Sequence, residues 1–140
     1  MMKKILLLVL ACVMLLSCGK KEVKPVSQES KVTMEAFALA ETVKNAFIVK
    51  DNITLKKNST ESGYKDITAN TRLFDSVELT FTPRWVDIEN NQFSVNISWK
   101  STWIVSGKSR AERGMAVFVM EGAPLKVSKI LRANPFVMPE

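Results

Sequence analysis

A regular alternation of apolar and polar side chains between residues 93 and 105 constrains the fold most strongly. The odd positions are apolar except for Ser101, and the even positions up to Thr102 are polar. A period of two over this length is typical of a β-strand with one buried face. The sequence therefore predicts a long, half-buried antiparallel strand whose odd-numbered side chains face a covering layer.

Strands are also predicted on either side of this segment. Residues 77–85 alternate in the same way, with Trp85 on the face of Phe81, and the pattern then inverts, as a β-bulge would cause. A third strand is expected over residues 110–121, where an apolar run on both faces indicates a central position. A fourth strand is expected over residues 125–131. Turn residues separate these segments, so the sheet is expected to be antiparallel.

The segment from residue 31 to about residue 50 has helical spacing instead. Its apolar residues recur at intervals of three and four and form one stripe: Ala36, Leu39, Val43 and Ala46. Ser30 or Thr33 is expected to cap the start of this helix. Residues 58–63 have the composition of a loop, and a second, short helix is expected over residues 66–77. The predicted fold is a single α+β domain, in which the long N-terminal helix packs on a curved four-stranded antiparallel sheet.

The N-terminus carries the pattern of an export signal. Two lysines precede an unbroken apolar run over residues 5–16, which is short for a membrane span. The Leu-Leu-Ser-Cys sequence at residues 15–18 resembles the lipobox of bacterial lipoproteins, in which the cysteine is acylated and the signal is cut just before it. This resemblance implies a covalent lipid such as palmitate on Cys18. An ordinary cleaved signal or a membrane anchor is the alternative.

The lipobox divides the chain into a signal peptide over residues 1–17, a polar, flexible tether over residues 18–30 and a folded domain over residues 31–140. Gly19 follows the cysteine, and the sorting rule that comes with the resemblance then implies the outer membrane, facing the periplasm. Two lysines leave with the signal, which lowers the formal net charge from +6 to +4. The remaining basic residues are scattered, so no nucleic-acid site is expected.

The residue types present exclude several kinds of catalysis. The chain has no histidine, and its two cysteines are Cys12 in the signal and Cys18 at the lipobox. The folded domain therefore has no thiol for a disulfide, a zinc site or a nucleophile, and it lacks the side chain most often used for acid–base chemistry. We expect no metal and no cofactor apart from the covalent lipid.

Long hairpin-linked strands with Trp99 and Trp103 on the inner face are followed by two further patterned segments, residues 113–119 and 125–136. This layout resembles the nuclear transport factor 2-like domains, a group that includes SnoaL-like and ketosteroid isomerase-like proteins. The resemblance implies a cone between helix and curved sheet, inside which the enzymes of the group work. A cystatin-like layout, with one helix on four strands, is the alternative.

Two groups of residues are candidates for a pocket. Tyr64 and Asp66 could serve as proton donor and base, although the favoured interpretation is that Tyr64 anchors a loop and Asp66 caps the following helix. Trp85, Trp99 and Trp103 could line an apolar pocket, although aromatic residues at alternating strand positions are more often core. Because the small, polar Ser101 lies beside it, Trp103 is expected to border a cavity.

A third group of candidates is basic. Lys108, Arg110 and Arg113 lie around a predicted hairpin tip. They could contact an anion such as a lipid headgroup or a glycan phosphate, although a charged hairpin tip is normally just solvated.

These observations favour a small binding or protein-interaction module, held at the membrane through Cys18, with an unidentified protein or a small apolar ligand as its partner. The alternative is a ligand-sequestering or isomerase-like enzyme that uses the cone. A deep cavity with a buried carboxylate would favour the enzyme, and a filled core with an exposed apolar patch would favour the module. A homodimer through the sheet is a further option for this fold.

Overall fold

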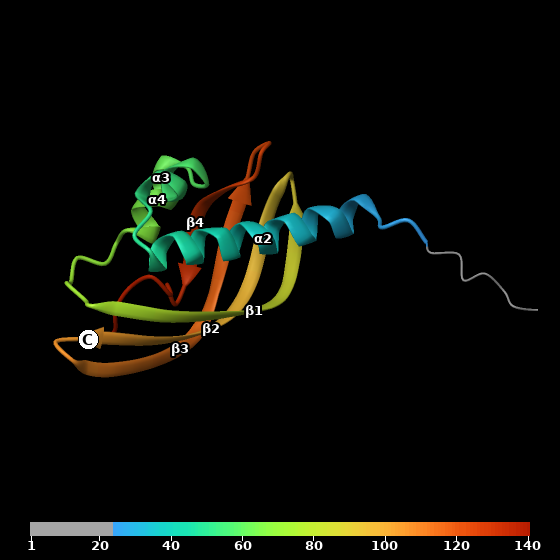
Figure 1. The fold of residues 1–140 in the computed structure, drawn as a ribbon. Helices are drawn as coiled ribbons and strands as arrows, with labels where there is room; N and C mark the ends of the chain where they lie inside the picture. Colours follow the sequence, from blue (N-terminus) through green and yellow to red (C-terminus); the bar gives the residue numbers. More distant parts are fainter. Residues whose placement is uncertain (1–23) are drawn as a thin grey trace, which may run out of the picture.

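The computed structural model describes residues 24–140, so the signal, Cys18 and the first part of the tether lie outside the described residues. It shows an α+β fold in which one long helix crosses the concave side of a curved antiparallel sheet (Figure 1). This confirms the predicted fold class. The elements are α2 (Gln28–Ile48), α3 (Asn52–Lys57), α4 (Glu61–Ile67), β1 (Ser76–Glu89), β2 (Gln92–Val105), β3 (Lys108–Glu121) and β4 (Lys126–Arg132).

Helix α2 begins a few residues earlier than predicted. Its cap is Ser27, whose hydroxyl oxygen accepts the backbone N–H of Ser30 at 3.1 Å. The prediction of Ser30 or Thr33 as the cap is wrong, because Ser27 already satisfies one of the free N–H groups of the first turn. Glu29 in that turn suits the positive end of the helix dipole. The buried stripe is as predicted and comprises Ala36, Leu39, Ala40, Val43, Ala46 and Phe47.

The sheet has the order β1-β2-β3-β4, and every neighbouring pair is antiparallel. The predicted β-bulge is present, because the register of β1 against β2 shifts between Pro83 and Trp85. After the shift Trp85 lies opposite Asn96, on the side of the sheet away from α2, and 51% of its surface is exposed. The expectation that Trp85 shares the buried face of Phe81 is therefore wrong, since the extra residue of the bulge reverses the direction of the side chains that follow.

The segment before the sheet differs from the prediction. The expected helix over residues 66–77 is absent from the structure. Two short helices, α3 and α4, lie earlier in the chain instead, and α4 ends at Ile67. Each has its own cap, Asp51 for α3 and Thr60 for α4. Thr54 donates its hydroxyl and its backbone N–H to the Asp51 carboxylate, and these hydrogen bonds lower the pKa of that carboxyl. Capping at Thr60 explains why residues predicted as a loop begin a helix.

The residues around α4 cover the outer edge of β4. Val127 exchanges backbone hydrogen bonds with residues 58–60, at 2.9 Å to the Thr60 N–H and 3.0 Å to the Asn58 carbonyl. The helix lies so close that a Cβ atom on Gly63 would be 2.0 Å from the Val127 carbonyl oxygen. Paired and covered in this way, β4 is protected from pairing with another chain.

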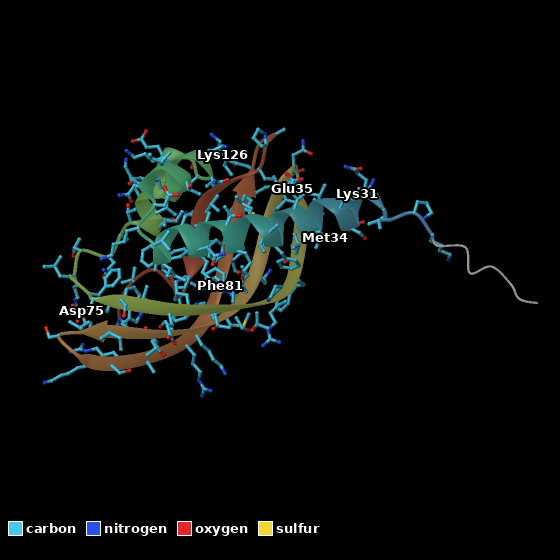
Figure 2. All side chains as sticks on the ribbon, viewed as in Figure 1. Lys31, Met34, Glu35, Asp75, Phe81 and Lys126 are labelled. Atoms are coloured by element: carbon cyan, nitrogen blue, oxygen red, sulfur yellow. The ribbon has the colours of Figure 1, made fainter. Side chains whose placement is uncertain are left out.

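An aromatic cluster fills the space between α2 and the sheet. The ring centroid of Phe47 on α2 lies 4.8 Å from that of Phe136 and 6.1 Å from that of Trp103, and Phe74 contacts both Phe47 and Trp103. Phe81 projects from β1 toward α2 (Figure 2), and the Lys44 amine lies 5.6 Å from the centroid of its ring. The predicted inner parity of β2 is confirmed, because the buried apolar residues of that strand are Val95, Ile97, Trp99 and Trp103.

Candidate functional site

The side of the sheet that faces away from α2, here called the outer face, is uncovered by any described helix (Figure 1). Strand register places the even-numbered residues of β2 on this face, because the odd-numbered ones lie in the core. On β3 the outer residues are odd-numbered, since Lys100 lies opposite Arg113 and Ser98 lies opposite Met115. The outer face is therefore built from side chains of neighbouring strands that are distant in sequence.

A groove with a volume of about 530 Å³ runs across this face. We call it the cationic groove. It is lined by Thr82, Arg84, Ser98, Trp99, Lys100, Arg113, Gly114 and Met115. Three of these residues are basic and none is acidic. The Arg84 Nε group donates to the Ser98 hydroxyl oxygen at 2.8 Å, which fixes the direction of that guanidinium.

One lining residue of the groove, Gly114, also makes room for a core tryptophan on the inner face of the sheet. Gly114 lies opposite Trp99 in the register of β2 and β3. A Cβ atom on Gly114 would be 2.8 Å from Cζ2 of Trp99 and 3.0 Å from the Cβ atom of Ala133. Trp99 is otherwise buried and donates its indole N–H to the Ala133 carbonyl oxygen at 2.9 Å. The absent side chain at position 114 thus leaves room on the inner face of the sheet for the ring of a core tryptophan.

The row of the sheet next to the groove is more apolar. This row takes one residue from each strand, and each residue is paired with the next across the sheet. In order from β1 to β4 they are Trp85, Asn96, Val117 and Leu131. Trp85 and Leu131, at the two ends of this row, are exposed, and Val117 is buried between its neighbours. The Asp87 carboxylate accepts the indole N–H of Trp85 at 3.1 Å and the amide of Asn96 at 3.3 Å, so the exposed tryptophan is held in place.

The structure separates the three basic residues that were expected to act together. Arg113 lies on the outer face, in the cationic groove. Arg110 lies opposite Trp103 and is therefore on the other side of the sheet, and Lys108 shares its parity. Arg84 and Lys100 join Arg113 instead, and the sequence prediction missed both. Their even-numbered positions on polar strand faces were visible in the sequence, but the register that brings them together was not.

The tryptophans expected to line a pocket are divided between two environments. Trp99 and Trp103 belong to the core, and Trp85 belongs to the outer face. Trp103 was expected to border a cavity, but it is completely buried, and its indole N–H donates to the Ser101 hydroxyl at 3.2 Å. Its ring contacts those of Phe47 and Phe74.

Tyr64 and Asp66 lie on α4 and not in a loop. Residues two apart on a helix do not face each other. One carboxylate oxygen of Asp66 accepts the backbone N–H of Ile130 at 2.8 Å, and its carbonyl oxygen accepts the side-chain amide of Asn134 at 2.8 Å. The expectation that Asp66 caps a following helix is wrong, because no helix follows it and its side chain ties α4 to β4. Tyr64 has the Lys56 amine 5.5 Å from its ring centroid.

Neither a metal centre nor a membrane span is visible in the described part of the chain. Acidic side chains within residues 24–140 do not gather in a group that could hold a metal ion. The helices of this region are too short or too polar to cross a bilayer. In comparisons with known proteins, the chain matches no family model, no curated protein and no solved structure.

Proposed function

We propose that this chain is a lipoprotein of the cell envelope, anchored by an acylated Cys18 in the outer membrane and facing the periplasm. In this proposal its folded domain is a binding module that meets its partner through the outer face of the sheet. The apolar run followed by Leu-Leu-Ser-Cys supports the anchor. The helix on a curved antiparallel sheet is consistent with the nuclear transport factor 2-like resemblance, which stays part of the proposal.

The single observation that carries the binding function is the contrast between the two faces of the sheet. The inner face is occupied by the aromatic cluster around Phe47. The outer face carries a half-exposed tryptophan, Trp85, beside a groove of about 530 Å³. Small-molecule sites have volumes of about 300–1,000 Å³. A fixed aromatic next to a charged groove is a typical contact surface for a partner.

The alternative, an isomerase-like or ligand-sequestering enzyme, would use the space between helix and sheet. Phe47, Phe136 and Trp103 fill that space. Asp66, the carboxylate considered for a base, already accepts a backbone hydrogen bond from β4. Both observations favour a binding module over an enzyme.

Capture experiments on detergent-solubilised membranes test the binding function. The wild-type chain is compared with Trp85→Asp and with Leu73→Asp, since Leu73 is a strongly exposed apolar residue outside the sheet. We expect Trp85→Asp to lose a partner that wild type and Leu73→Asp retain. A partner set that is the same for all three proteins would contradict the proposed surface.

Metabolic labelling with a fatty acid tests the anchor. We expect label on the wild-type chain and none on Cys18→Ser, which should accumulate as an unprocessed precursor. Label that persists on Cys18→Ser would contradict lipidation at this residue, whatever the capture experiment shows.

A further inference from the structure

Three cations line the cationic groove, and none of its lining residues is acidic. Lys100 and Arg113 lie directly opposite each other on β2 and β3, and Arg84 lines the same groove from β1. Like charges that are directly opposite on a sheet destabilise the fold. The ion pairs within residues 24–140 are Lys44 with Glu41, Lys65 with Glu61 and Arg72 with Glu140. None of these pairs includes a groove cation, so within the described residues the three charges are not engaged in an ion pair and are available to an external anion.

The groove also supplies directed hydrogen-bond donors. Arg84 uses its Nε group on Ser98, which leaves the two terminal nitrogens of the guanidinium for a ligand. The planar guanidinium of Arg113 offers a second set of paired N–H donors, and the ammonium group of Lys100 adds a compact positive charge. This combination suits the tetrahedral oxygens of a phosphate. Thr82, a hydroxyl-bearing residue, also lines the groove.

We propose that the cationic groove binds the phosphate group of an organic phosphate monoester. A phosphate monoester carries a charge of about −1.5 to −2 at neutral pH and three acceptor oxygens, which matches three cations better than the single charge of a carboxylate does. The organic part extends over Met115, which lines the groove, toward the exposed Trp85 in the next row of the sheet. The ester comes from a soluble metabolite or from a lipid headgroup, which the experiment below distinguishes.

The inference rests on the proposed function only in its choice of the outer face, and it is tested separately. The mature full-length chain, in a non-ionic detergent without phosphate, is titrated with glycerol 3-phosphate and with short-chain phosphatidic acid. These probes share a phosphate monoester and differ in acyl chains. Backbone amide shifts in nuclear magnetic resonance spectra report binding, and we expect them in residues 82–85, 98–100 and 113–115.

The matched variants are Arg113→Gln and Arg110→Gln, which change the same residue type on the same strand on opposite sides of the sheet. We expect Arg113→Gln to weaken binding at least about tenfold, the typical effect of losing a charge-assisted hydrogen bond, and Arg110→Gln to weaken it less than about twofold. Lys100→Gln is a second groove variant in case Arg113→Gln fails to fold. A thermal melt of each variant controls for folding.

Equal affinity for glycerol 3-phosphate and phosphatidic acid would mean that the phosphate group is sufficient for binding. The ligand would then be a soluble phosphate ester. Tighter binding of phosphatidic acid identifies a lipid headgroup, with its acyl chains contacting the apolar row. Both results support the proposal. Absence of shifts with both probes, equal weakening by Arg113→Gln and Arg110→Gln, or tighter binding of a short polyglutamate peptide would overturn it. The capture experiment with Trp85→Asp can still succeed in any of those cases, so the two proposals fail separately.

Discussion

Trp103 donates its indole N–H to the hydroxyl of Ser101, two residues earlier on the same strand, at 3.2 Å. Both side chains are buried on the inner face of β2. A buried donor without a partner is costly. The hydroxyl of Ser101 thus allows a large polar aromatic to lie in an otherwise apolar core.

Ser101→Ala should destabilise the domain by about 1–3 kcal/mol, because it leaves the indole N–H unsatisfied. The effect should shrink when position 103 is already phenylalanine, which has no N–H to satisfy. Urea unfolding of the two single variants and of the double variant measures this coupling. Strictly additive costs would mean that the hydrogen bond has no role in stability.

Trp99→Ala should cost on the order of 3–5 kcal/mol, as truncation of a buried aromatic generally does. Only 3% of the Trp99 surface is exposed, and its indole also donates to the Ala133 carbonyl oxygen. The neighbouring Lys100→Ala should cost less than about 0.5 kcal/mol, because Lys100 is exposed on the outer face. Equal urea midpoints for the two variants would contradict the register of β2.

Gly63→Ala should destabilise the domain by about 1–3 kcal/mol through overpacking. An alanine inside a helix is normally better than glycine by about 0.5–1 kcal/mol, so the expected effect has the opposite sign to helix propensity. The cause is the Val127 carbonyl oxygen, 2.0 Å from where the new Cβ atom would lie. Ser62→Ala, at an exposed position of the same helix, is the control and should stay within about 0.5 kcal/mol of wild type in thermal unfolding.

Asp66→Ala should cost about 1–3 kcal/mol, because the backbone N–H of Ile130 loses its acceptor. Tyr64→Phe should stay within about 0.5 kcal/mol of wild type. Chemical denaturation of both variants distinguishes this structural role from a catalytic one. If Tyr64→Phe and Asp66→Asn each abolished turnover of a substrate while stability stayed within about 1 kcal/mol, the binding-module proposal would have to be abandoned.

The strands were the predictable part of this fold. A period of two over residues 93–105 gave the correct inner face of β2, and the inversion after Trp85 correctly placed a bulge. The extra residue of the bulge is Arg84, and it reverses the direction of Trp85, which follows it. A repeating pattern does not show at which residue such a reversal begins. Trp85 was therefore assigned to the core although it lies on the outer face.

The short helices and the groove depend on contacts between distant residues. Helix α4 is only seven residues long, and isolated helices of that length are marginal in water. Close packing of Gly63 against Val127 of β4 stabilises this helix. The sequence around α4 does not reveal that contact, because Val127 is distant in the chain. In the same way, Arg84 and Arg113 become neighbours of Lys100 only through the register of three strands. Sequence spacing instead suggested Arg113 with Arg110, which lies on the opposite side of the sheet.

Photo-crosslinking in intact cells tests most directly whether the outer face is the binding surface. A photo-reactive amino acid replaces Thr80, an exposed residue of β1 opposite Lys100, and in a control it replaces Ile53, which is exposed on α3. The account predicts a specific adduct from position 80 and none from position 53. The absence of an adduct at position 80, or the same adduct from both positions, would contradict it.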